Sequence, residues 1–271
     1  MEPRKRGRPG LKKTASLLSR LKTPLVILAL LAIWELCVRI FKVKEYILPS
    51  PIVALKHLFI PQPDANYNWL LHIRITLMEI ALSFVVTSVL GIAIAIGIAW
   101  SSAVKKIVMP AFVFLNSLPV VAVAPLLVLW YGYGLKTNIL IAFLVSFFPI
   151  VINTAVGLSE IDEDLLDLVK YLHGTKTQIF IKLRIPNSLP YIFTGLKISS
   201  TMCVVGAIVG EFIASDKGLG YIIINSQYTM DSPPIFAGLM LVSLFGVILF
   251  GLVAAAEKLC MPWRFRTKGG D

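Results

Sequence analysis

Charged residues are scarce in this sequence. Asp, Glu, Lys and Arg make up 15% of the 271 residues, whereas hydrophobic residues make up 57%. Soluble globular domains carry about 25% charged residues, so this composition excludes a water-soluble fold. The mean hydropathy of +0.81 instead predicts an all-α, polytopic membrane helical bundle, because a helix satisfies its own backbone hydrogen bonds in lipid.

Cysteine and histidine are also rare, with three residues of each type. Their wide separation excludes a disulfide framework and a familiar metal-ligand spacing. The sequence contains no HExxH or GxSxG motif, and Gly174-Thr175-Lys176-Thr177 lacks the upstream glycine of a phosphate-binding loop. We therefore expect no metal, no cofactor and no catalytic residue, and no ATP hydrolysis by this chain alone.

Six apolar segments are long enough, or nearly so, to cross a bilayer, which requires about 20 residues. We expect about six transmembrane helices at 24–41, 71–100, 107–130, 137–157, 190–213 and 235–257. A short interfacial helix is expected in the loop between the first two. The chain then divides into a basic tail (1–23), a transmembrane domain (24–258) and a second tail (259–271).

The basic residues are distributed unevenly around these segments. If the N-terminus is cytoplasmic, 18 of the 26 Lys and Arg residues lie on the cytoplasmic side and 5 lie outside. This asymmetry follows the positive-inside rule and predicts a multi-pass protein of the cytoplasmic membrane with both termini in the cytoplasm. It also explains the net charge of +11 without nucleic acid, and the basic N-terminal tail can contact anionic lipid.

The segment 159–188 is the longest polar interruption between apolar segments. Ser159 with Asp162, and Thr175 with Gln178, have capping-box spacing. Gly174 is expected to end the first helix with a positive φ. Pro186 is expected to end the second helix and Pro190 to open the next span. Two short amphipathic helices at a bend are typical of a docking element.

Polar residues inside the predicted spans are candidates for a translocation pathway: Asn116, Ser117, Asn153, Glu79 and Glu211. For the two glutamates, structural pairing with Arg74 or Lys217 is the alternative to contact with a transported molecule. Pro110, Pro119 and Pro125 should interrupt the third span. Small residues should allow close helix packing at Gly91, Gly97, Gly206 and Gly210.

Several motifs together resemble the permeases of ABC importers. Gly174, Ile185-Pro186, Pro190 and Gly195-Leu196 are similar to their cytoplasmic EAA loop. The nitrate/sulfonate/taurine group, whose relatives also serve pyrimidine vitamin precursors and riboflavin, is resembled by further short motifs: Leu48-Pro49-Ser50-Pro51, Ala124-Pro125-Leu126, Trp130-Tyr131-Gly132-Tyr133-Gly134, Gly210-Glu211-Phe212 and Gly218-Leu219-Gly220-Tyr221. The Glu-Ala-Ala positions of the family are here Leu168, Val169 and Lys170, and the nearest acid, Asp167, lies one residue early.

The resemblance implies the transmembrane subunit of an ATP-driven importer of a small solute. Its expected partners are a second copy of the permease, ATP-binding cassette ATPase subunits and an extracytoplasmic substrate-binding protein. It implies that the cytoplasmic loop couples transport to the ATPase through Asp167, Leu168, Leu172, Gly174, Ile185, Pro186 and Pro190. A secondary transporter, and a polytopic scaffold or enzyme without an ATPase, are the alternatives, but neither an internal repeat nor a catalytic constellation is visible.

Overall fold

The computed structural model describes residues 25–26, 28–59 and 68–266, and within these ranges the regular secondary structure is helical, without a strand. The all-α expectation is confirmed. The chain divides into two compact units. One comprises Met1–Asn66 and Ser226–Ala237, and the other comprises Tyr67–Asn225 and Gly238–Asp271.

The first unit contains a helical stretch at 28–40 and helix α2 (Pro51–Phe59). Ser50 Oγ accepts a hydrogen bond from the Val53 N–H at 3.3 Å, which caps α2. This is the short helix predicted between the first two spans. The first predicted span lies partly outside the described residues. Residues 1–23, 60–67 and 267–271 lie wholly outside them.

Among the residues that the structure describes, four stretches of helix are long and apolar enough to cross a membrane. They are α3 (Trp69–Trp100), α6 (Leu135–Ser159), the continuous rod Lys176–Ala214 and α11 (Ser232–Cys260). The rod consists of α8 (Lys176–Ile179), the π-helical turn η1 (Phe180–Arg184) and α9 (Ile185–Ala214). The shorter helices are α4 (Ser102–Ser117), α5 (Val120–Tyr131), α7 (Glu163–Tyr171), α10 (Leu219–Tyr228) and α12 (Pro262–Arg266).

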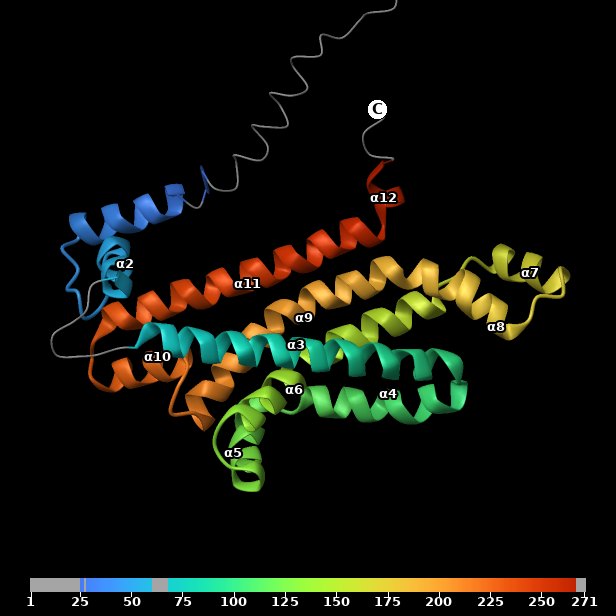
Figure 1. Ribbon diagram of the computed structural model, residues 1–271, viewed down its shortest axis with the longest axis horizontal. Helices are drawn as coiled ribbons and strands as arrows, with labels where there is room; N and C mark the ends of the chain where they lie inside the picture. Colours follow the sequence, from blue (N-terminus) through green and yellow to red (C-terminus); the bar gives the residue numbers. More distant parts are fainter. Residues whose placement is uncertain (1–24, 27, 60–67, 267–271) are drawn as a thin grey trace, which may run out of the picture. The chain divides into compact units, whose positions relative to one another are not determined.

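The expected span at 107–130 is not one helix but two, α4 and α5, which meet at an angle of 96° (Figure 1). Leu118, which precedes Pro119, has extended backbone angles (φ −73°, ψ 128°), because a residue before proline avoids the α region. Pro110 and Pro125 stay inside their helices. Only one of the three expected interruptions therefore breaks the chain direction.

Helices α6 and α9 pack against each other through glycines, and Figure 1 shows them side by side with α3. A Cβ on Gly206 would lie 2.6 Å from Ala142 Cα, and one on Gly210 would lie 3.0 Å from Asn138 Cα. The close contact expected from GxxxG is confirmed. Gly91 likewise faces Ile150, but the expectation for Gly97 is wrong, since no other helix among the described residues comes within 4 Å of a Cβ at this position.

Candidate functional site

The polar segment 159–188 forms α7, a short turn, α8 and η1. Its predicted first cap is wrong. Ser159 is the last residue of α6 and its hydroxyl donates to the Ala155 carbonyl at 2.8 Å. The cap is Asp162, whose Oδ1 accepts from the Asp164 N–H at 3.0 Å. An acid is favourable there because it faces the positive end of the α7 dipole.

The expectation that Gly174 takes a positive φ is also wrong. The left-handed residue after α7 is His173, with φ 56°, and Gly174 follows it with its N–H bonded to the Val169 carbonyl at 2.8 Å. Gly174 is required for space instead. A Cβ there would overlap Val169 Cγ1 and lie 3.0 Å from the Val169 carbonyl oxygen.

The capping box of α8 is confirmed. Thr175 Oγ1 accepts from the Gln178 N–H at 3.3 Å, and Gln178 Oε1 accepts from the Thr175 N–H at 2.8 Å. However, Pro186 does not end this helix, and Pro190 lies inside α9. The π-helical turn directly before Pro186 widens the backbone, and a widened turn accommodates a ring that would otherwise clash with the preceding turn.

The outer face of α7 carries exposed apolar side chains. Leu165, Leu168 and Leu172 at its end are 47%, 54% and 67% exposed, and their spacing of three and four residues places them on one face. Asp167 lies on the same helix. Leucines on a short polar loop cannot all face lipid while the neighbouring acids stay in water. This face is therefore available to a protein partner.

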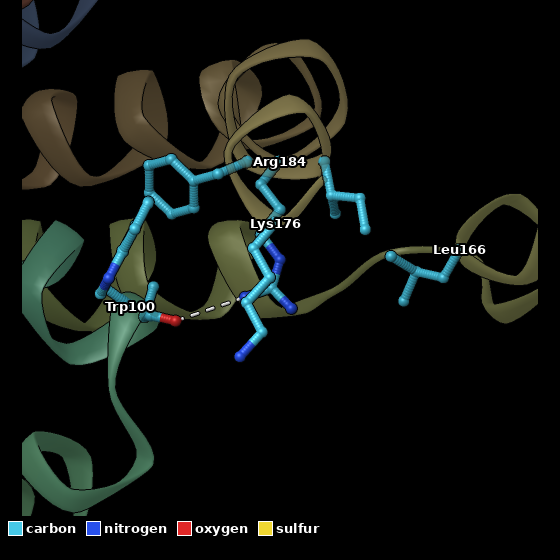
Figure 2. A pocket seen from close by; sticks show the side chains of 7 residues that line it. Trp100, Leu166, Lys176 and Arg184 are labelled. Carbon is cyan, nitrogen blue, oxygen red and sulfur yellow. Dashed lines mark hydrogen bonds between the residues drawn. The ribbon is translucent and has the colours of Figure 1, made fainter. Parts of the chain in front are cut away.

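A groove of about 470 Å³ lies between this segment and the end of α3 (Figure 2). On one side, the Trp100 ring meets the Phe180 ring edge-on, with centroids 4.9 Å apart. Arg184 donates to the Ala99 carbonyl at 3.3 Å, and Lys176 extends beside it. Leu166 of α7 contributes to the lining. The groove thus combines two cations with apolar and aromatic walls.

Glu79 of α3 and Glu211 of α9 are buried, at 1% and 0% exposure. The predicted pairing with Arg74 or Lys217 is wrong, because no ion pair joins these groups in the described part of the chain and both cations are exposed. Both carboxyl groups belong instead to one buried polar cluster, because Thr76, one helical turn before Glu79 on α3, donates to Glu211 at 2.5 Å. Asn138 Nδ2 of α6 donates to Glu79 at 2.7 Å, so the cluster joins three spans.

The loop between α9 and α10 is attached to this cluster. Thr76 Oγ1 donates to Glu211 at 2.5 Å and accepts from the Leu219 N–H at 2.9 Å. The Gly220 N–H donates to the other Glu211 oxygen at 2.5 Å. His72 Nδ1 accepts from the Gly218 N–H at 2.9 Å. Sequence reasoning missed Thr76 and Asn138, although Thr76 lies one helical turn before Glu79.

The three remaining pathway candidates do not form one cluster. Asn116 and Ser117 lie at the exposed end of α4 beside the broken span, and Asn116 lines a pocket of about 260 Å³ with residues of α5 and α6. Asn153 of α6 donates to the Pro149 carbonyl at 2.8 Å and lies where α6 meets Gly195 of α9. The predicted role of all three stays a prediction.

Comparison with known proteins gives one family. The family model described as "Binding-protein-dependent transport system inner membrane component" matches residues 68–259. The formylaminopyrimidine transport permease of Halalkalibacterium halodurans is 33% identical, over 90% of this chain and 96% of that protein. The riboflavin transport permease of Chloroflexus aurantiacus is 30% identical, over 89% of each chain. The putative aliphatic sulfonates permease of Bacillus subtilis is 28% identical, over 97% of this chain and 94% of that protein.

A solved structure shows the same fold at lower identity. A chain of the MetNI methionine ABC transporter, crystallised in an inward-facing conformation, superposes with a TM-score of 0.51. It is 19% identical, and the match covers 66% of this chain and 93% of that one. The likeness supports the helical architecture described above and nothing about substrate.

Proposed function

Since the chain belongs to the family of binding-protein-dependent transport system inner membrane components, and is thus the permease of an ABC importer, we propose that segment 159–188 couples it to a separate ATPase. The observation that carries this proposal is the exposed row Leu165, Leu168 and Leu172 on a polar loop between two membrane-spanning helices. An exposed apolar row with polar neighbours is typical of a surface that binds another protein.

The ATPase must be another chain, because this sequence has no phosphate-binding loop. The capped α7 and α8 present a preformed face, and the groove with Lys176 and Arg184 lies beside it. We infer that closure of an ATPase dimer moves this face. Helix α8 is continuous with α9, so the displacement passes directly into a membrane span.

The further partners follow from the family. An importer of this kind takes its solute from an extracytoplasmic binding protein, and we propose that two copies of this permease form the membrane channel. The relatives are named for transport of formylaminopyrimidine, riboflavin and aliphatic sulfonates. We propose a solute in this range, either a small anion of the sulfonate or taurine type or a pyrimidine or flavin vitamin compound.

The test places a charge on the exposed apolar face. Leu172→Asp should weaken co-purification of the ATPase at least about tenfold, because an unpaired charge in a docked apolar interface is costly. Leu172→Ala should give a smaller loss. The measurements are pull-down of the ATPase with purified permease, and ATP hydrolysis in proteoliposomes with binding protein.

Lys182→Gln is the matched control. Lys182 is exposed in η1, and its replacement changes the net charge of the segment by the same amount without touching the leucines. We expect normal assembly and hydrolysis for this variant. Normal assembly and stimulated hydrolysis by Leu172→Asp would show that another surface couples the subunits.

A further inference from the structure

The groove between segment 159–188 and the end of α3 lies where a membrane-spanning helix leaves the hydrocarbon. Residues 80–104 carry no charged side chain, and a span needs about 20 such residues. Trp100 is the last residue of α3 and is 58% exposed. A tryptophan at the end of a span is typical of the membrane–water interface. The groove is therefore at the depth of the lipid headgroups.

The rod Lys176–Ala214 leads to the same depth. Its 39 residues form a helix of about 58 Å at 1.5 Å per residue, whereas the hydrocarbon core of a bilayer is about 30 Å thick. A large part of the rod must therefore project from the hydrocarbon. Lys176, Lys182 and Arg184 lie together at one end of the rod, and this cationic end is the one that forms the groove.

Two of these cations line the groove, and none of the described residues that line it is acidic. Arg184 Nη1 donates to the Ala99 carbonyl at 3.3 Å, which fixes the guanidinium against the last turn of α3. A guanidinium has five N–H donors in a fork that matches two phosphate oxygens, and this bond uses only one of them. Lys176 is exposed and adds a second positive charge. The groove therefore suits an anion.

The other walls of the groove are apolar. The Trp100 and Phe180 rings meet edge-on with centroids 4.9 Å apart, and Ile179 and Leu166 complete the lining (Figure 2). Its volume of about 470 Å³ is within the range of about 300–1,000 Å³ that is usual for small-ligand sites. A phospholipid carries an anionic phosphate next to an apolar body, and basic pockets between membrane helices bind such headgroups.

We propose that this groove binds the headgroup of an anionic phospholipid, with Lys176 and Arg184 on the phosphate and Trp100 and Phe180 against the glycerol and the first acyl carbons. A zwitterionic headgroup fits less well, because its own cation is repelled by the two side chains. The bound lipid connects the end of α3 to segment 159–188. Lipid binding does not depend on the function proposed above, but an effect of the lipid on coupling rests on it.

Native mass spectrometry of the full-length permease, released from a non-ionic detergent, counts the lipids that stay bound as phosphatidylglycerol is titrated. We expect one tightly bound copy per chain. Lys176→Gln and Arg184→Gln should each weaken its binding about fivefold, as for loss of one cation near an anionic lipid surface. Because Lys176 is exposed, its replacement should not disturb folding. Lys182→Gln is the matched control, since it removes the same charge from the same end of the rod outside the groove, and should leave the affinity almost unchanged.

Four results would overturn the proposal. Equal weakening by Lys182→Gln would show that the lipid responds to the total charge of the segment and not to the groove. Equally tight binding of phosphatidylcholine would exclude recognition of an anionic headgroup. Displacement of the lipid by inorganic phosphate at similar concentration would identify a site for a free anion. Displacement by the assembling ATPase would assign the groove to the surface that binds the ATPase.

ATP hydrolysis in nanodiscs separates this inference from the proposed function. With the ATPase and the binding protein present, stimulated hydrolysis should be higher in nanodiscs that contain phosphatidylglycerol than in phosphatidylcholine alone, and Lys176→Gln should abolish this difference. If segment 159–188 does not bind the ATPase, pull-down fails while the isolated permease still retains its lipid, and only the proposed function is contradicted. Normal pull-down by a permease that retains no phosphatidylglycerol contradicts the lipid site alone.

Discussion

Glycines carry a hydrogen atom in place of a side chain, and this allows α6 and α9 to approach each other closely. Gly206→Ala would place a methyl group 2.6 Å from Ala142 Cα, and backbone cannot yield as a flexible side chain can. We expect a loss of about 1–3 kcal/mol of stability, as for overpacking elsewhere, seen as a lower midpoint of thermal unfolding in detergent. Gly97→Ala is the control, because its Cβ would meet no other helix within 4 Å in the described part of the chain, and equal destabilisation by both would contradict this explanation.

At the same scale, the sequence identifies some local features and misplaces others. The Thr175–Gln178 capping box was predictable because both of its hydrogen bonds lie within four residues. The intrinsic preference of glycine predicts the left-handed conformation at Gly174, but His173 adopts it. Position 174 requires glycine because a Cβ there would overlap the Val169 side chain. This close approach depends on how α7 ends.

At the scale of elements, the break between α4 and α5 opens a pocket in which Asn116 is the polar side chain. Pro119→Ala frees Leu118 to become helical, so we expect α4 to extend and the pocket to close. In Asn116→Cys permease, the reaction rate with a water-soluble maleimide should fall several-fold when Pro119→Ala is added. Pro110→Ala should have little effect, since Pro110 lies inside α4 and not at the break between the helices. A similar rate in all three proteins would show that Pro119 does not keep the pocket open.

The sequence could not show which proline breaks the third span. Pro110, Pro119 and Pro125 impose the same local restriction on the residue before them. The choice is tertiary, because Phe112 of α4 packs against Phe147, whereas Leu127 of α5 belongs to a cluster with Ile141 and Ala214. Because α4 and α5 pack against different residues, the chain bends between the two helices, at Pro119.

For the whole molecule, the distribution of Lys and Arg predicts which side of the membrane each loop occupies. Cysteines replacing the exposed Tyr133 and Tyr228 should react in intact cells with a thiol reagent that does not cross the membrane. A cysteine replacing Tyr171, which is 83% exposed on α7, should react only after permeabilisation. Ser226, an outside residue by the same reasoning, is unsuitable because it is buried. Labelling of position 171 from outside would show that the orientation in the membrane is the reverse of the predicted one.

The overall class of the protein was predictable, because hydropathy, charge asymmetry and loop motifs depend only on the local sequence and not on tertiary contacts. The acid cluster was not, because Glu79, Asn138 and Glu211 come from three helices far apart in the sequence. The sequence identifies Glu79 and Glu211 as intramembrane acids and offers Arg74 or Lys217 as pairing partners, or contact with a transported molecule, as explanations. Only the packing of α3, α6 and α9 brings the acids together.

The continuous rod Lys176–Ala214 also restricts how its length can vary. Each residue of an α-helix turns the chain by about 100°, so an insertion between Gly195 and Gly206 would rotate Glu211 away from Thr76 and leave the coupling segment where it is. The π-helical turn Phe180–Arg184 is different, since a wide turn holds one residue more than an α-helical turn. Losing one residue there restores an ordinary turn and preserves the phase of everything beyond it. Because the wide turn also accommodates the Pro186 ring, a deletion at this end of the rod is tolerable only together with replacement of Pro186, and changes of length are excluded from the middle of the rod.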